Sequence, residues 1–290
     1  MKTMMRTAVL AMALATTVVV SAQEAAKQAA DPWPWDFPQS VPLKAETGQL
    51  ALSCYGHYFD AVEKGQKMID NTMIFYKTVI EKVGPEKTIV DDWGKEREVP
   101  NALIIPLAKN AKAKKGDILL TWWQSGSGMQ RAIVVDDSDP TQPFVCYLDQ
   151  SWPDNPDSPK LAEKRKGEQL KPGTFTVLKG GKWESGEQVA YHTKGEWNAG
   201  KIVHVDGDKV LLSVFASYVD ATTKDRVKLI PFKEKFKVGD KVSVLWVRYY
   251  RPGYTVVKVD EATGHVYVKK DGSDNIESKS IVEVTKVLNN

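Results

Sequence analysis

The sequence predicts an all-β chain of small tandem barrels that follows a short irregular N-terminal segment. Two observations carry this prediction. Short runs of β-branched and aromatic residues recur along the chain, separated by Gly, Asp and Pro turn signals. A Gly-led motif also opens these runs at intervals of about 50 to 70 residues, which is typical of a repeated structural unit.

The motif consists of a Gly, a polar residue and an apolar residue three positions after the Gly. It occurs at Gly65-Gln66-Lys67-Met68, Gly116-Asp117-Ile118-Leu119, Gly186-Glu187-Gln188-Val189 and Gly239-Asp240-Lys241-Val242. Further strand-like runs follow each motif, which predicts units at 65–110, 111–180, 181–234 and 235–290. The second unit carries an insertion at 150–171. We expect it to be a loop with at most one helical turn, because Pro and charged residues replace apolar alternation there.

Units of this size favour closed sheets. An open sheet of short strands leaves unpaired edges, and closing it into a barrel removes them. Each core is then small, since a domain of ~60 residues buries only about 60% of its unfolded surface. We therefore expect neighbouring units to pack against one another.

Residues 1–22 have the three parts of a signal peptide. A basic start at Lys2 and Arg6 is followed by an apolar run and by a site after Ala22 that suits a signal peptidase. The apolar run is shorter than the roughly 20 residues that cross a bilayer, so we expect no transmembrane span. Gln23 stands where a lipoprotein requires Cys. The mature chain is expected to be soluble and periplasmic or secreted.

Residues 23–64 form an N-terminal strap rich in Pro and Trp in its middle part. The stretch Asp31-Pro32-Trp33-Pro34-Trp35-Asp36-Phe37-Pro38 favours an extended path, because proline removes backbone donors and fixes φ. Two interpretations stay open for its aromatic residues: they pack onto a barrel, or they dock a partner.

The chain has two cysteines, Cys54 and Cys146. In an oxidising compartment we expect them to form a disulfide, which the chain-entropy model values at about 4 to 5 kcal/mol for a loop of this length. Two buried, inert thiols are the alternative. No metal site is expected, because neither cysteine has a second Cys at ligand spacing and only His57 lies near Cys54.

The charge balance does not favour nucleic acid. The full sequence has 40 basic and 37 acidic residues, and loss of Lys2 and Arg6 with the signal peptide brings the mature chain close to neutrality. Proteins that hold nucleic acid through its phosphates usually carry a clear basic excess. We therefore expect no nucleic-acid partner.

No pattern in the sequence indicates catalysis. The four histidines, His57, His192, His204 and His265, are scattered over different parts of the chain. No nucleophile elbow, zinc-protease helix motif or phosphate-binding Gly-rich loop is present. The acidic pairs Asp91-Asp92 and Asp136-Asp137 lie where strands end, and such pairs are usually turn residues. We expect no enzyme and no cofactor, and a hydrolase is a distant alternative.

The fourth unit resembles a Tudor or Agenet domain. The resemblance is carried by Val238–Trp246 with its Gly-Asp-Lys-Val opening, by Tyr254–Val259 and by His265–Lys269. The other units resemble these families more weakly, over roughly residues 65–288 as a whole. The resemblance implies tandem SH3-like or Tudor-like barrels.

The same resemblance implies an aromatic cage for a cation, since aromatic faces hold desolvated cations. Carried over to this sequence, the ligand-binding residues are Trp246, Tyr249, Tyr250, Tyr254 and Tyr267. Secondary aromatic candidates are Trp122, Trp123, Tyr147, Tyr191, Trp197 and Phe215. Trp246 shares its phase with Val242 and Val244, so a core position is equally consistent for it. Tyr267 alternates with Val266 and Val268, so we expect it on the polar, exposed face.

These observations predict a non-catalytic binding protein outside the cytoplasm. The expected ligand is a peptide, an envelope protein or another cationic group held on aromatic faces. The alternative is a cell-wall glycan, as bound by bacterial SH3-type modules.

Overall fold

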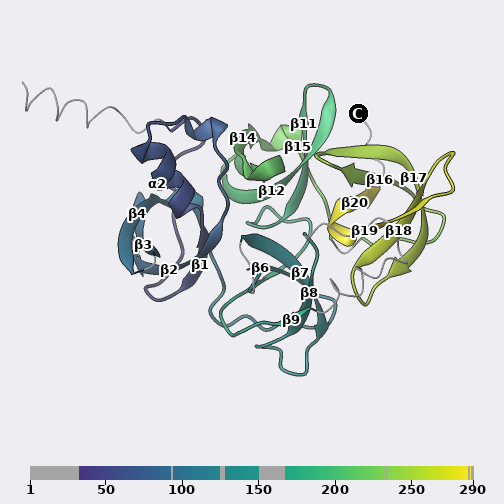
Figure 1. Ribbon diagram of the computed structural model, residues 1–290, viewed down its shortest axis with the longest axis horizontal. Coiled ribbons are helices and arrows are strands. Elements are labelled where there is room, and N and C mark those ends of the chain that lie inside the picture. The colour runs from purple at the N-terminus through teal and green to yellow at the C-terminus, as the bar shows by residue number, and fades with distance from the viewer. Residues whose placement is uncertain are drawn as a thin grey trace, which may run out of the picture. The chain divides into compact units, whose positions relative to one another are not determined.

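The computed structural model describes residues 33–92, 94–124, 128–149, 167–232, 234–286 and 288. The described residues form four antiparallel β modules with few helical turns, which confirms the predicted all-β class (Figure 1). No helix in this part of the chain is long and apolar enough to cross a bilayer. The predicted signal peptide at 1–22 lies outside the described residues, as do 23–32 of the strap and 150–166 of the insertion.

The first two modules lie between Leu50 and Leu178. The first contains β1 (Leu50–Ser53), α2 (Tyr55–Glu63), η1 (Met68–Asp70), β2 (Tyr76–Lys82), β3 (Lys87–Asp92), β4 (Lys95–Pro100), η2 (Asn101–Leu103) and β5 (Ile104–Pro106). The second contains β6 (Ile118–Trp122), β7 (Met129–Asp136), β8 (Phe144–Tyr147), β9 (Glu168–Gln169) and β10 (Thr176–Leu178). The end of the expected loop at 150–171 is thus a short strand, β9, paired with β8.

The last two modules lie between Gln188 and Lys286. The third contains β11 (Gln188–Thr193), β12 (Glu196–Asp206), β13 (Lys209–Val214), η3 (Phe215–Ser217), β14 (Val219–Thr223), η4 (Lys224–Arg226) and β15 (Val227–Leu229). The fourth contains β16 (Lys241–Trp246), β17 (Tyr249–Asp260), β18 (His265–Lys270), β19 (Ile276–Ser280), η5 (Ile281–Glu283) and β20 (Val284–Lys286).

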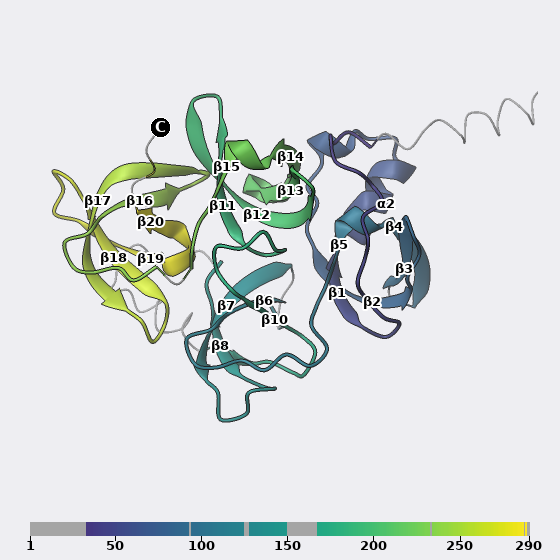
Figure 2. The same ribbon diagram turned by 180° about the vertical axis from the view of Figure 1, so that it is seen from behind.

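Every module has the same strand order, in which the first strand lies between the second and the last. The orders are β5-β1-β2-β3-β4, β10-β6-β7-β8-β9, β15-β11-β12-β13-β14 and β20-β16-β17-β18-β19. Figure 2 labels β5 and β10, which complete the first and second modules against β1 and β6. The modules are therefore repeats of one topology.

A glycine with a left-handed backbone precedes the first strand of each module. These residues are Gly48, Gly116, Gly186 and Gly239, with φ between 79° and 95°. Their N–H groups donate to the carbonyls of Ile80, Val134, Ile202 and Val256, at 2.7 to 2.9 Å. The residue after each glycine accepts a hydrogen bond in return from the N–H of the same second-strand residue. The positive φ explains why the repeat requires Gly here.

The same second-strand residues mark a β-bulge. The pairing register shifts just after Ile80, Val134, Ile202 and Val256 in their respective strands. A bulge bends a strand and increases its twist, so it lets one long strand curve around a small core. The repeated bulge and the repeated glycine together set the curvature of each module.

The predicted start of the first unit is wrong. Its opening glycine is Gly48, whereas Gly65 follows the end of α2 and Met68 begins the 3-10 turn η1. Strand β1 and helix α2 lie within the strap expected at 23–64, yet β1 pairs with both β2 and β5. This strap is therefore partly a structural component of the first module.

Two aromatic residues of the strap are packing residues. Trp35 and Phe37 are buried. The indole N–H of Trp35 donates to the carbonyl of Val219 at 2.7 Å, which ties the strap to β14 of the third module. A buried Trp usually satisfies its N–H in this way.

The expected disulfide is wrong. Cys54 and Cys146 are both buried thiols, and no disulfide joins them. Cys54 lies just before α2 in the first module, whereas Cys146 lies in β8 of the second. Burial raises the pKa of the Cys54 thiol to about 12, so it stays protonated and unreactive in the folded chain.

Separate apolar cores stabilise the modules. The second module buries Leu119, Val134, Tyr147 and Phe175 among others, while Val189, Ile202 and Leu212 form the core of the third. In the fourth module, Val242, Val256 and Val268 pack with Tyr254.

A buried polar network connects the second, third and fourth modules. Arg131 of β7 makes hydrogen bonds with both carboxylate oxygens of Asp149 and donates to Gln188 Oε1 at 2.5 Å. Gln188 in turn donates to the Tyr250 hydroxyl at 2.9 Å, and Lys201 Nζ lies 3.3 Å from Asp149. Burial by itself raises the pKa of Asp149, but the charges of Arg131 and Lys201 hold it well below its usual range.

We predict that Arg131→Met destabilises the chain by about 3 kcal/mol, because it leaves the buried carboxylate of Asp149 without its principal partner. Chemical denaturation measures this change. As a control, Lys269→Met breaks the exposed pair with Asp274 and should cost less than about 1 kcal/mol. Equal effects of the two substitutions would contradict the role of the network.

A half-buried histidine connects the first and third modules. His204 Nε2 lies 2.6 Å from the carbonyl oxygen of Ile104, which links β12 to β5. Burial lowers the pKa of His204 from its ordinary value of 6.5, and hydrogen bonds to backbone carbonyls only partly offset this effect. The folded state therefore holds this imidazole neutral.

We predict that the free energy of unfolding falls as the pH drops below about 6.5, by at most about 1.4 kcal/mol per pH unit from His204. The sign follows because the unfolded chain takes up a proton there that folded His204 does not. In His204→Gln this slope should be smaller, while any contribution from His57 is the same in both proteins. Identical slopes in the variant and the parent would show that His204 does not titrate as described.

Candidate functional site

The tyrosines that were predicted to bind a ligand differ in their exposure to solvent. Tyr254 is 3% exposed and belongs to the apolar core of the fourth module. Tyr250 is 6% exposed, and burial raises its pKa well above its usual range. Tyr267 is 5% exposed. The expectation that Tyr267 lies on an exposed face is therefore wrong, and Tyr250 and Tyr254 are buried as well.

Tyr267 shows the reason for the error. It lies on the face of β18 opposite Val266 and Val268, as strand alternation requires. That face is nevertheless covered, and the ammonium group of Lys258 lies 5.0 Å from the centroid of the Tyr267 ring. The alternation of side chains along a strand predicts the face on which a side chain lies, but it does not predict which other residues cover that face.

Trp246 is a surface residue rather than a core residue. It is the last residue of β16, beyond the core of the module, and its side chain is 45% exposed. The guanidinium of Arg251 lies 3.8 Å from the centroid of its ring. Of the predicted aromatic set in the fourth module, Trp246 and the half-buried Tyr249 are thus accessible.

The secondary aromatic candidates divide in the same way. Trp122, Tyr147 and Tyr191 are buried. Burial is the principal cause that raises the pKa of Tyr191 to about 12. Trp123 and Phe215 are exposed, and Trp197 is half-buried.

Two hairpins bring accessible aromatic residues of different modules together. The β11–β12 hairpin of the third module and the β16–β17 hairpin of the fourth pair at Asn198 and Tyr249. The N–H of Ala199 donates to the carbonyl of Arg248 at 2.8 Å. The sheets of the two modules are therefore continuous at this point.

A cavity of 420 Å³ lies beside this pairing. Its aromatic side chains are Trp197, Tyr249 and Tyr250. The other lining residues are Gly195, Glu196, Arg251, Pro252 and Leu288. Its size is within the range of ordinary ligand sites, and an aromatic lining with a few polar groups is typical of them. We refer to it as the hairpin cavity.

Cations of the chain itself already lie on the aromatic faces around the hairpin cavity. Lys228 Nζ lies 4.2 Å from the centroid of the Trp197 ring, and the Arg248 guanidinium lies 4.5 Å from that of Tyr249. The guanidinium of Arg251 likewise lies over the ring of Trp246. An external cation would have to displace these groups, so the arrangement does not favour the expected cage for a cationic ligand.

The turn of the β16–β17 hairpin is strained. Val247 has a φ of 59°, which is rare for a β-branched residue. A second cavity, of 300 Å³, lies beside this turn and is lined by Val247 and Arg248 and by Ala216 and Ser217 of η3, among others. Ala216 and Ser217 also have positive φ values, of 57° and 59°. Backbone strain of this kind is concentrated at functional sites.

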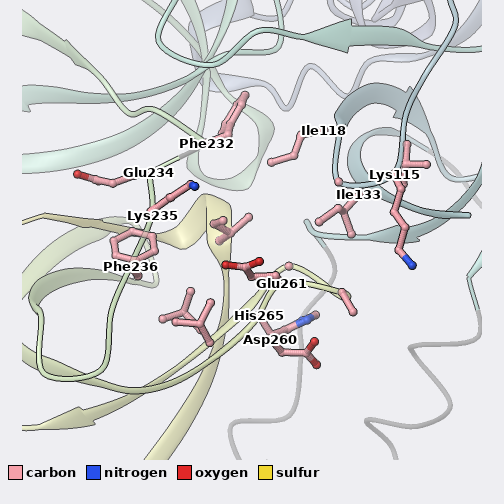
Figure 3. A pocket seen from close by; sticks show the side chains of 17 residues that line it. Lys115, Ile118, Ile133, Phe232, Glu234, Lys235, Phe236, Asp260, Glu261 and His265 are labelled. Carbon is pink, nitrogen blue, oxygen red and sulfur yellow. The ribbon is translucent and has the colours of Figure 1, made fainter. Parts of the chain in front are cut away.

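A third cavity, of 480 Å³, is lined by residues of the second and fourth modules and by the segment that connects the third and fourth (Figure 3). Figure 3 shows Ile118, Ile133 and Phe232 on one side of it and Asp260, Glu261 and His265 on the other. Lys115 and Lys235 also line it. Its charges have both signs, so they favour no single class of ligand.

Sequence reasoning missed Arg248, Arg251 and Glu196 as neighbours of the aromatic side chains. The signal for the arginines was present, because the stretch Trp246-Val247-Arg248-Tyr249-Tyr250-Arg251 places two arginines among three aromatic residues. Within the described ranges, no cluster of His, Cys, Asp and Glu is arranged to hold a metal ion.

Comparison with known proteins assigns no family to the chain. No family model matches the chain. No curated protein matches it either. Among solved structures, the chain is similar to the four MBT repeats of Drosophila melanogaster Sfmbt in complex with the peptide RHR(me)KVLR, at 9% identity over 87% of this chain and 91% of that one, with a TM-score of 0.16. A TM-score this low assigns neither a family nor a ligand.

We predict that two aromatic substitutions in the fourth module change the free energy of unfolding by very different amounts. Tyr267→Ala removes a buried ring and should cost about 3 kcal/mol of folding free energy. Trp246→Ala removes an exposed ring and should change stability by less than about 1 kcal/mol. Thermal melting of both variants tests this, and a Trp246→Ala variant that melts as early as Tyr267→Ala would contradict the positions described.

Proposed function

We propose that the chain is a non-catalytic binding protein that acts outside the cytoplasm and takes a peptide segment of a partner protein in the hairpin cavity. The observation that carries the proposal is the meeting of Trp197 with Tyr249 and Tyr250 at the paired hairpins. Large aromatic side chains dominate the energetics of protein interfaces, so three of them around one cavity favour a binding role.

The chemistry of the lining residues supports binding rather than catalysis. Burial keeps the Tyr250 hydroxyl protonated, and this hydroxyl already accepts a hydrogen bond from Gln188. The described lining consists of aromatic, aliphatic, glycine, proline, glutamate and arginine residues. These groups suit recognition of shape, stacking and charge.

Location outside the cytoplasm rests on the signal-peptide pattern of residues 1–22. The export proposal implies a mature chain that starts at Gln23. That chain, purified from the cell envelope, is the bait in the experiment below, and its intact mass reports the cleavage site. A mass that includes residues 1–22 would contradict export with cleavage.

We predict that the mature chain captures a defined envelope protein, and that Trp197→Ala and Tyr249→Ala each weaken the capture. Loss of one stacking aromatic should cost about 0.5 to 1.5 kcal/mol of binding free energy, or roughly two- to tenfold in affinity. Trp123→Ala, which removes an exposed Trp of the second module, is the matched control.

The affinity of the captured protein is then measured for each variant. Equal affinity for Trp197→Ala and the parent would exclude the hairpin cavity as the site. Retention of the chain on purified peptidoglycan, with loss on Trp197→Ala, would replace the peptide with a glycan as its ligand.

A further inference from the structure

We infer that the segment bound at the hairpin cavity is acidic, with a carboxylate side chain beside an aromatic or other apolar one. This inference rests on the proposed function and specifies its ligand. It reverses the cationic ligand that the aromatic residues alone suggest. It is based on the exposure of Arg248 and Arg251 and on the aromatic rings over which their guanidinium groups lie.

Both arginines are exposed and lie over aromatic rings, with 4.5 Å for Arg248 and 3.8 Å for Arg251 between the guanidinium carbon and the ring centroid. Within the described part of the chain, no carboxylate lies within ion-pair distance of either guanidinium. The ion pairs found there involve other basic residues, such as Lys241 with Asp271 and Lys269 with Asp274. Each guanidinium thus retains its charge and its donors for a ligand.

Stacking prepares an arginine to bind a carboxylate. The planar guanidinium directs its N–H groups sideways, in the plane of the group, so a ring against one face leaves the donors exposed at the edge. A carboxylate meets such an edge with two parallel hydrogen bonds. Because the ring already restricts the side chain, less rotamer entropy is lost when the carboxylate binds.

The remaining charges around the hairpin cavity point the same way. Lys228 lies on Trp197, and Lys194 is in the turn of the β11–β12 hairpin. Glu196 is the carboxylate among the lining residues that the structure describes. Among the lining residues and the groups that lie over the aromatic rings of the cavity, the cations Lys228, Arg248 and Arg251 outnumber Glu196, which favours an acidic segment over a basic one.

The positions of the groups define the order of the ligand's side chains. Arg251 lines the cavity together with Trp197 and Tyr249, so an apolar side chain that enters the cavity places its neighbour in the segment near Arg251. Arg248 lies on the same hairpin, just before Tyr249. A segment with a carboxylate beside an aromatic residue would meet Arg251, whereas Arg248 lies over the Tyr249 ring and lines the neighbouring 300 Å³ cavity.

The test uses three synthetic peptides with blocked ends, of sequence Gly-Glu-Phe-Glu-Gly, Gly-Gln-Phe-Gln-Gly and Gly-Lys-Phe-Lys-Gly. Their binding to the mature chain is measured by NMR titration. We expect the Glu peptide to bind about fivefold or more tightly than the Gln peptide, and the Lys peptide to bind most weakly. Binding of the Glu peptide should weaken as salt rises from about 0.05 M to about 0.3 M.

Variants separate the contribution of Arg251 from that of the aromatic lining of the cavity. Arg251→Gln should reduce the ratio of Glu-peptide to Gln-peptide affinity from about fivefold to nearly one. Trp197→Ala should weaken the binding of both. Lys269→Gln is the charge-matched control, because Lys269 belongs to the same module but pairs with Asp274. Melting temperatures confirm that each variant is folded.

The inference is overturned if the Lys peptide binds as tightly as the Glu peptide, if Arg251→Gln keeps the full preference, or if the Glu peptide does not bind at millimolar concentration. The proposed function survives these results as long as Trp197→Ala weakens the capture of the envelope protein. It fails by itself if Trp197→Ala has no effect on that capture.

Discussion

The buried ion pair between Arg131 and Asp149 is the interaction on which the position of the later modules depends. A buried charge is tolerated only with a partner and satisfied hydrogen bonds, so this pair has essentially one acceptable arrangement. Arg131 also holds Gln188 at the start of β11, and Gln188 holds the hydroxyl of Tyr250 in β17. Because Tyr250 forms one wall of the hairpin cavity, the shape of the cavity depends on a charge that lies in another module.

The packing of the modules also decides which aromatic residues remain available to a ligand. An isolated small barrel would expose the outward side of Tyr250, but here Tyr250 packs with Ala190 and Ile230 of the third module. The β16–β17 hairpin extends beyond the core at Trp246, whereas Trp197 is half-buried and packs against this same cluster. Arg251 lies over the Trp246 ring and Lys228 over the Trp197 ring. Burial thus separates Tyr254 and Tyr267, which stabilise the fold, from Trp246, Tyr249 and Trp197, which keep accessible surface. The cations that lie over these accessible rings change the charge of the ligand that they suit.

Local pattern was sufficient for the fold class and for much of the strand layout. The β-branched runs near Val134, Ile202 and Val256 lie in second strands, and Gly116, Gly186 and Gly239 precede first strands because their turns need a positive φ. The first module was misread because Gly65 precedes a large apolar residue, Met68, whereas the true opening at Gly48 precedes the smaller Ala51. What identifies Gly48 is its hydrogen bond to Ile80, a contact distant in sequence.

The candidate site was only partly predictable for the same reason. Two arginines lie among three aromatic residues within the β16–β17 hairpin, so part of the hairpin cavity was present in the sequence. The pairing of Asn198 with Tyr249 joins residues of different modules, and no periodicity indicates it. Likewise, the disulfide was expected because an exported chain enters an oxidising compartment. That reasoning does not give the positions of Cys54 and Cys146, and each is buried in a different module.

The third and fourth modules form one continuous sheet at their hairpins. Hydrogen exchange of the Ala199 amide reports on this pairing, because its N–H donates to the carbonyl of Arg248 in the other module. The structure predicts that Ala199 is protected about as strongly as Ile202, whose N–H is bonded to Glu187 within the third module. Exchange of Ala199 at the rate of an open loop, with Ile202 still protected, would show that the hairpins do not pair and that the cavity between them does not exist.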